Sequence, residues 1–264
     1  MSLIKVKNQR EDGGNLFHYA HFICDCLFPE VIAGVPEYNN VFRVKNLNQT
    51  LGNFEKIYSQ VFHSVNIELC EDYFNKLDCE EKIIKRSSFH ENGSDFEKFR
   101  DFIFYSLNIK KESDRKYPEV LLIKRGERVD LISDTYLKKQ NKNLTNGKER
   151  REIKGIERAE RRLSEKYRDK FNSIVLENMS FKDQISYFYH AKMIVCAHGA
   201  CMANLFFCQA ETSVIEVNAQ TPEDKRMGAG HYPFFDTICR VLNLNQHKIQ
   251  RNNGFNLLKY IDSL

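Results

Sequence analysis

The stretch that decides the fold runs from Met193 to Phe207 and reads MIVCAHGACMANLFF. Its first five residues are apolar and predict a buried strand, His198 and Gly199 predict a tight turn, and the apolar residues behind them predict a helix. Small residues at such a turn let a ligand approach the backbone, and the N–H groups of the following helix favour a phosphate or diphosphate. The stretch therefore predicts a nucleotide-like ligand at the end of a strand, unless Gly199 is a packing glycine and His198 a core residue.

A second buried strand follows at Ser213–Val217, with the carboxylate of Glu216 near its carboxyl end. An acid at this place in a dinucleotide-binding fold accepts hydrogen bonds from both hydroxyls of a ribose. Glu216 is therefore the candidate that holds the ribose of the ligand.

Strands and helices alternate along the rest of the chain. Helices are predicted from Leu16 to Val35, from the capping box at Ser94 to about Leu107, and from Ser180 onward. Further strand-like runs lie at residues 40–44, 65–69, 82–85, 120–124 and 173–176. This alternation is typical of βαβ units and predicts an α/β fold with a mostly parallel sheet.

The polar stretch Lys110–Tyr117, ended by Pro118, is the best candidate for a linker and divides the chain near its middle. It predicts two Rossmann-like domains, residues 1–115 and 116–264, with a ligand cleft between them. The last helix either stays with the second domain or packs back on the first.

The 264 residues are 42% apolar and 29% charged, which excludes a disordered or fibrous chain. The net charge is +4, and the surplus is concentrated in residues 138–170, which hold 13 Lys and Arg and six Asp and Glu. Ile153, Ile156, Leu163 and Tyr167 recur there at helical spacing and predict a solvated helix with one docked apolar stripe. The alternative is a nucleic-acid-binding helix, but acids interrupt the basic run and no aromatic stacking platform accompanies it.

The first residues, Met1–Lys7, lack the apolar core and cleavage site of a signal peptide, and no stretch reaches the roughly 18 uninterrupted apolar residues of a membrane span. We therefore expect a cytoplasmic location and no transmembrane segment. The eight cysteines lack the paired spacing of zinc sites. We expect most of them to be reduced and buried as small hydrophobes.

Three sequence segments occur in a particular order along the chain, and this order is more informative than any one of the segments alone. The first is the N-terminal His/Asp segment Asn15–Asp25, and the second is the strand Val120–Arg128, which ends in an arginine pair. The third is the His-Gly-Ala turn with Asn204 behind it, followed by the Val-Ile-Glu-Val strand. Together with a closing helix in residues 229–244, they resemble glycosyltransferase family 61, which includes β-1,2-xylosyltransferases and O-linked N-acetylglucosaminyltransferases.

The resemblance implies an inverting, metal-independent transfer of a sugar from a UDP-sugar to a glycan hydroxyl, on a GT-B-like scaffold of two facing domains. Xylose is the first expectation for the sugar and N-acetylglucosamine the second, with no metal or other cofactor and no nucleic-acid partner. The chain has no Asp-x-Asp motif, which agrees with a metal-independent enzyme. Two departures are Cys201, where the family usually has Gly, and Ala203, where it usually has Thr or Ser. From the second departure we expect one hydroxyl contact of the family to be missing.

Such a transfer needs a general base near the acceptor hydroxyl. Asp25 is the first candidate, and His21, four residues before it on the same helix face, would orient it or contact the acceptor. A structural pair is the alternative for the two residues, and Asp72 and Asp78 are the other candidate bases.

The leaving diphosphate needs positive or dipolar groups around it. Arg125 and Arg128 follow a buried strand directly, so we expect them to bind the diphosphate, with surface salt bridges as the alternative. The other expected members of the donor site are His198, Gly199, Ala200, Asn204 and Glu216. We expect the first three to lie against the diphosphate or nucleoside, the asparagine to fix the loop, and the glutamate to hold the ribose.

Overall fold

The structure is a computed structural model, and it describes residues 4–8, 19–34, 41–43, 54–62, 67–69, 80–84, 93–111, 116–127, 153–177, 179–218, 234–249 and 254–264. The described residues up to Ile109 form one compact unit, and those from Lys110 onward form another. Among these residues, none of the helices combines the length and the apolar character needed to span a bilayer.

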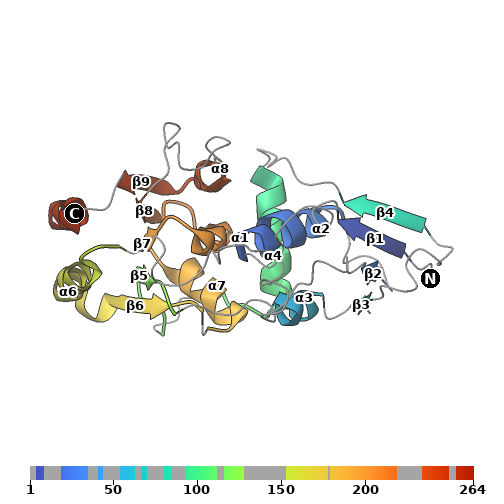
Figure 1. Cartoon of the computed structure of the whole chain (residues 1–264), viewed down its shortest axis with the longest axis horizontal. Coiled ribbons are helices and arrows are strands. Elements are labelled where there is room, and N and C mark those ends of the chain that lie inside the picture. Colours follow the sequence, from blue (N-terminus) through green and yellow to red (C-terminus); the bar gives the residue numbers. More distant parts are fainter. Residues whose placement is uncertain are drawn as a thin grey trace, which may run out of the picture. The chain divides into compact units, whose positions relative to one another are not determined.

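The second unit is built on a five-stranded, Rossmann-like parallel sheet with the strand order β6-β5-β7-β8-β9 (Figure 1). This sheet confirms the predicted α/β class. The strands are β5 (Val120–Lys124), β6 (Phe171–Val175), β7 (Met193–Ala197), β8 (Ser213–Val217) and β9 (Asn245–Ile249). The helical segments are α6 (Ile156–Tyr167), the 3-10 turn η6 (Arg168–Lys170), α7 (Phe181–His190), the 3-10 helix η7 (Ala200–Phe207), α8 (Phe234–Val241) and α9 (Gly254–Ser263).

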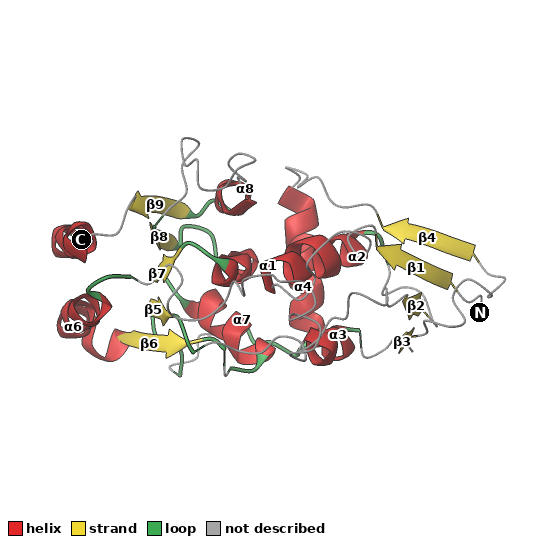
Figure 2. Ribbon diagram, viewed as in Figure 1, coloured by secondary structure: helices red, strands yellow, loops and turns green. Residues whose placement is uncertain are grey.

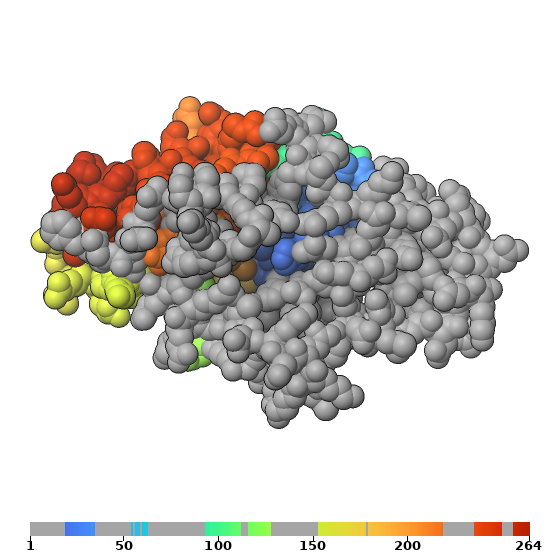
Figure 3. Space-filling model, turned by 45° about the horizontal axis from the view of Figure 1, so that its top comes forward, coloured from blue at the N-terminus to red at the C-terminus, as the bar shows by residue number. Residues whose placement is uncertain are grey.

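The two faces of this sheet bury different helices. On one face, Val195 and Ile215 of the central strands join Leu163 of α6 and Leu257 of α9 in one buried apolar cluster. The helices α6 and α9 lie side by side there (Figures 1 and 3). Figure 1 shows α7 and α8 on the opposite face, where η7 contacts both of them. The sheet is therefore covered on both sides, which agrees with the near-continuous apolar character of β5, β7 and β8.

Polar contacts fix α6 on its face of the sheet as well. Glu160 accepts hydrogen bonds from Nζ of Lys124 at 3.0 Å and from the hydroxyl of Ser173. Burial raises the pKa of Glu160, but these two hydrogen bonds outweigh that effect and hold the pKa below its usual value. Since Leu163 is also fully buried, the predicted docking of α6 through one apolar stripe is confirmed.

The strand order of the five-stranded sheet reverses at β5. The next strand in sequence, β6, pairs on one side of β5, whereas β7 pairs on the other side. In open α/β sheets, ligands bind in the crevice outside the carboxyl ends of the strands at such a reversal. Arg125 and His198 are the residues that directly follow β5 and β7, so the topology singles out these two positions.

The first unit contains a four-stranded parallel sheet with the strand order β3-β2-β1-β4 (Figure 2). Phe28 packs edge-on against Phe96 and Phe99, and the ring centroids are 5.3 Å apart in both pairs. The strands are β1 (Ile4–Asn8), β2 (Val41–Arg43), β3 (Ile67–Leu69) and β4 (Glu80–Ile84). The helical segments are α1 (Tyr19–Phe22), the π-helix η2 (Ile23–Leu27), α2 (Phe28–Ile32), α3 (Glu55–Val61) and α4 (Gly93–Ser106).

The predicted elements agree with this structure in type and differ in detail. Ser180 caps α7 as expected, because its hydroxyl accepts a hydrogen bond from the backbone N–H of Asp183 at 3.1 Å. The strands β1 and β9 were not predicted, and the helix after the His198–Gly199 turn is a 3-10 helix. The domain boundaries, the GT-B-like pairing of domains and the cleft between them stay predictions.

Candidate functional site

Arg125 and Gly199 meet at the carboxyl ends of β5 and β7. A Cβ atom added to Gly199 would lie 3.6 Å from Nη1 of Arg125, so the guanidinium group lies beside a backbone that carries no side chain. Gly199 is extended, with φ 165° and ψ −168°, and any residue can adopt this conformation. The glycine therefore matters for the space it leaves next to a permanent cation, which suits an anionic ligand.

The 3-10 helix η7 begins directly after Gly199 and runs from Ala200 to Phe207. Its side chains from Met202 to Phe207 are all buried, so the sequence has no one-sided stripe that would distinguish an α-helix from a 3-10 helix. The backbone N–H of Met202 donates to the carbonyl of Gly199 at 3.0 Å, which closes the first 3-10 turn.

A buried amide pair holds η7 against α7. Nδ2 of Asn204 donates to Oε1 of Gln184 at 3.2 Å, and Asn204 is completely buried. Nε2 of Gln184 donates in turn to the backbone carbonyls of Leu176 and Met179 at 3.1 and 3.3 Å. These contacts fit the interpretation that Asn204 fixes the loop.

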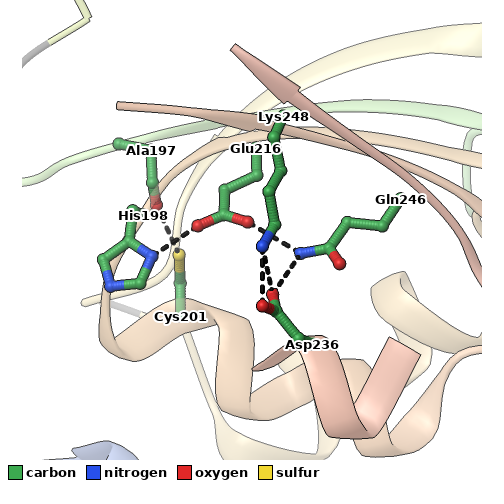
Figure 4. Close-up of polar contacts among 7 residues, drawn as sticks. All are labelled: Ala197, His198, Cys201, Glu216, Asp236, Gln246 and Lys248. Carbon is green, nitrogen blue, oxygen red and sulfur yellow. Dashed lines mark hydrogen bonds and ion pairs between the residues drawn. The ribbon is translucent and has the colours of Figure 1, made fainter. Parts of the chain in front are cut away.

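His198 and Glu216 form a buried pair at the ends of β7 and β8 (Figure 4). Nδ1 of His198 contacts Oε1 of Glu216, and the two residues are 8% and 2% exposed. Because an ionised carboxylate only accepts hydrogen bonds, Nδ1 carries the proton in this pair. The ring also meets Phe235 edge-on, with the centroids 5.4 Å apart. His198 is thus held in one orientation, with Nε2 directed away from Glu216 (Figure 4).

The second oxygen of Glu216 belongs to a larger polar network (Figure 4). Nε2 of Gln246 lies 2.7 Å from Oε2 of Glu216 and 3.2 Å from Oδ1 of Asp236. Nζ of Lys248 donates to Asp236 at 2.6 Å. Both oxygens of Glu216 therefore have partners within the protein, and its expected contact with a ribose stays a prediction.

The residues Asp236, Gln246 and Lys248 were missed by sequence reasoning. Gln246 and Lys248 alternate along β9, which places both on the same face of the strand. In the register of the sheet, Lys248 stands opposite Glu216. The alternation was the available signal, but β9 lies after the blocks that carry the family resemblance.

The described cysteines confirm the expectation of reduced and mostly buried thiols. All six of them are free, and five are buried, the exception being Cys201. The hydrogen bond between Cys196 and Cys201 raises the pKa of Cys196 and lowers the pKa of Cys201. Burial raises the pKa of Cys201, but the hydrogen bond and the positive charge of Arg125 together outweigh burial. Burial raises the pKa of Cys239 to about 12. Cys201 is therefore the more acidic and more accessible thiol, and its pKa responds to the charge of Arg125.

In the first unit, His21 and Asp25 form the predicted pair one helical turn apart. Nδ1 of His21 lies 2.7 Å from Oδ2 of Asp25, the carboxylate is completely buried, and the histidine side chain is 36% exposed. Asp25 lies within η2, and π-helical turns occur frequently at functional sites. A buried carboxylate behind a more exposed imidazole is the arrangement of catalytic His–Asp pairs, in which the acid fixes the orientation of the ring.

A second buried carboxylate in this helical segment, Glu30, was not among the predicted residues. The hydroxyl of Tyr58 donates to Oε2 of Glu30 at 2.5 Å, and Sγ of Cys26 lies 3.5 Å from Oε1. The contact with Tyr58 joins α2 to α3. An acid in an otherwise apolar helical run was the signal, because a buried carboxylate needs such partners.

Three of the predicted residues cannot be placed. Arg128 and the alternative bases Asp72 and Asp78 lie outside the described residues. Within the described part of the chain, no group of three or more His, Cys, Asp or Glu side chains is arranged to hold a metal ion.

The sequence model of the glycosyltransferase 61 family matches residues 19–215, which is more than half of the chain and includes the His21–Asp25 pair, Arg125 and His198. No curated protein matches the chain at a significant level. The family match ends within β8, one residue before Glu216.

Proposed function

The chain belongs to the glycosyltransferase 61 family, and we propose that this glycosyltransferase moves a sugar from a UDP-sugar to a hydroxyl group of a glycan. Xylose is the first candidate for the sugar and N-acetylglucosamine the second. Both follow from the activities found in the family, and no contact in the described residues favours either sugar. Transfer in the cytoplasm, without a metal ion, belongs to the same proposal.

The observation that carries the proposed donor site is the position of Arg125 beside Gly199. The diphosphate of the donor would lie outside the carboxyl ends of β5 and β7, where the strand order reverses and ligands of such sheets bind. Arg125 would bind its oxygens, and the absent side chain of Gly199 leaves the space for them. As charge develops on the departing diphosphate, the guanidinium group and the backbone N–H groups of η7 would stabilise it.

His198 is the second member of the proposed donor site. It follows β7 directly, and its Nδ1 is engaged by Glu216, so Nε2 is the nitrogen that would meet the nucleotide. Because both oxygens of Glu216 have protein partners, we assign it the positioning of His198, in preference to direct contact with the ribose.

The His21–Asp25 pair is the proposed base. His21 is the more exposed member, so we assign it the proton of the acceptor hydroxyl, while the buried Asp25 orients the ring and stabilises the imidazolium that forms. This exchanges the roles first predicted for the two residues. The acceptor oxygen then forms a bond to C1 of the sugar while the bond from C1 to the diphosphate oxygen breaks, and UDP leaves with the electron pair. One displacement of this kind inverts the configuration at C1.

A panel of UDP-sugars tests the proposal. Purified protein is incubated with UDP-xylose, UDP-N-acetylglucosamine, UDP-glucose and UDP-galactose, with and without EDTA, and the released UDP is measured. We expect UDP release from UDP-xylose above all others, unaffected by EDTA. Release from none of them, together with no binding of UDP by calorimetry, would overturn the proposed donor class. Loss of activity with EDTA would overturn the metal-independent mechanism alone.

Substitution of Arg125 tests the donor site itself. Arg125→Met should raise the Kd for UDP at least tenfold, because a charge-assisted bidentate contact is lost. Arg162→Met is the matched control, since Arg162 is 58% exposed on α6 and its ion pairs are long, at 3.8 and 4.0 Å. Equal affinities in the two variants would remove Arg125 from the donor site.

A further inference from the structure

The network behind His198 extends beyond the region that the family match covers. Glu216 is the first residue after that match, and Asp236, Gln246 and Lys248 come from α8 and β9. Gln246 is the residue that joins the two carboxylates of this network, at 2.7 and 3.2 Å from its Nε2 atom. Its role depends on what each carboxylate would do without it.

The orientation of the Gln246 amide follows from the groups it faces. Glu216 and Asp236 present carboxylate oxygens, which only accept hydrogen bonds, so the NH₂ group of Gln246 must point toward both. With the amide turned the other way, its oxygen would face two carboxylates. Nζ of Lys248 lies 2.6 Å from both carboxylate oxygens of Asp236, so the acceptor that shares the Gln246 amide is itself anchored by an ammonium group.

Loss of the Gln246 amide would act directly on Glu216. Glu216 is only 2% exposed, and water therefore cannot replace the lost donor at Oε2 without rearrangement. The nearby Asp236 carboxylate would repel Glu216 with no amide between them. The carboxylate would rotate or shift toward another donor, and its contact with Nδ1 of His198 would change as a consequence.

We propose that Gln246 is a positioning residue that acts through Glu216 to hold His198 in its Nδ1–H form, with Nε2 directed to the donor. Asp236 and Lys248 complete this support from α8 and β9. The proposal rests on the proposed function where it assigns the donor to Nε2. The fixed protonation of Nδ1, in contrast, is a property of the protein without any ligand.

Nitrogen-15 NMR of the histidine rings tests the proposal in the absence of donor, with the His198 signal identified by its loss in His198→Asn. Wild-type protein should show His198 with the proton on Nδ1. In Gln246→Leu, the signal should shift to a mixture of the two ring tautomers, and the Kd for UDP should rise about tenfold. Gln209→Leu is the matched control, because exposed Gln209 donates a single hydrogen bond, at 2.9 Å to the carbonyl of Tyr189.

The outcomes separate the two proposals. An unchanged Nδ1–H signal in folded Gln246→Leu overturns the positioning role, whatever the affinity for UDP. A changed signal in a protein whose wild-type form binds no UDP supports the positioning role and overturns the proposed donor site. If Gln246→Leu does not fold, Gln246→Asn takes its place, because its side chain is one methylene shorter and withdraws the amide from Glu216; the His198 signal should then shift in the same direction. Failure of both variants to fold, with Gln209→Leu intact, overturns the proposal in favour of a purely structural role.

Discussion

Replacing Gly199 with alanine should weaken the binding of UDP by about 10- to 100-fold while the free energy of unfolding stays within about 0.5 kcal/mol of the wild-type value. The added Cβ would lie 3.6 Å from Nη1 of Arg125 and 3.9 Å from the carbonyl oxygen of Ala197, which are ordinary contact distances. The backbone is extended at φ 165°, so alanine adopts it without strain. The methyl group would occupy the space that the donor oxygens need in order to reach the guanidinium group. One charge-assisted hydrogen bond is worth about 1.5–3 kcal/mol, which gives the expected loss of affinity.

Gly126 provides the opposite case at the end of β5. A Cβ atom there would lie 2.8 Å from Cγ1 of Val175 and 2.9 Å from Cδ of Glu177, so one of these groups must move. The backbone N–H of Gly126 also donates to Oε1 of Glu177 at 3.0 Å. Gly126→Ala should therefore cost about 1–3 kcal/mol of stability, and each kcal/mol lowers the Tm by about 2–4 °C in a domain of this size.

The assays are urea unfolding for stability and isothermal titration calorimetry with UDP for affinity, applied to both variants. If Gly199→Ala binds UDP as tightly as the wild type, the assignment of the donor to the ends of β5 and β7 is refuted. If Gly199→Ala is destabilised as much as Gly126→Ala, then Gly199 is a packing glycine, which is the alternative that its sequence context left open.

The hydrogen bonds to Glu160 lower its pKa in the folded protein. They stabilise the fold fully at a pH above the pKa of Glu160 in the unfolded chain, and this stabilisation is lost as the pH falls through the lower pKa of the folded state. Glu160→Gln should therefore flatten the decline of stability below about pH 5, measured by urea unfolding. Among the described cysteines, iodoacetamide at about pH 8 should label Cys201 before Cys239, because the pKa of Cys201 is lowered and that of Cys239 is raised to about 12. Equal labelling of the two by peptide mass spectrometry would contradict this. Asp25→Asn and His21→Gln should each lower the rate of transfer at least 100-fold with the Kd for UDP unchanged, and a wild-type rate in either variant would remove that residue from the base.

Much of the fold could be predicted because the central strands of the second unit, β5, β7 and β8, are buried on both faces. β5, β7 and β8 coincide with the predicted runs at 120–124, 193–197 and 213–217. β9 could not be found in this way. It lies at the edge of the sheet, and its sequence Asn-Gln-His-Lys-Ile has one buried residue, Ile249. An edge strand needs less apolar surface, so the pattern that reveals a central strand is missing.

In the candidate site, too, some contacts could be predicted from the sequence and others could not. The His21–Asp25 contact depends only on helical spacing, and the spacing of four residues predicted it. The contact between Gln246 and Glu216 depends on how β8 and β9 are registered, which places two residues 30 positions apart on one face. Spacing along the chain carries no information about that register. The partners of Glu216 therefore became apparent only in the folded sheet.

The pairing of β8 with β9 also bears on how the protein should be dissected. A fragment cut at the limit of the family match would end at Ile215, inside β8, and would lack β9 and α9. It would expose the long edge of a hydrophobic sheet and uncover the face on which α9 rests, which invites aggregation. If the truncated protein failed to bind UDP, the cause would be the disrupted sheet, and the result would not test the proposed donor site. Expression of the enzyme for screening or crystallisation should keep the chain through Leu264.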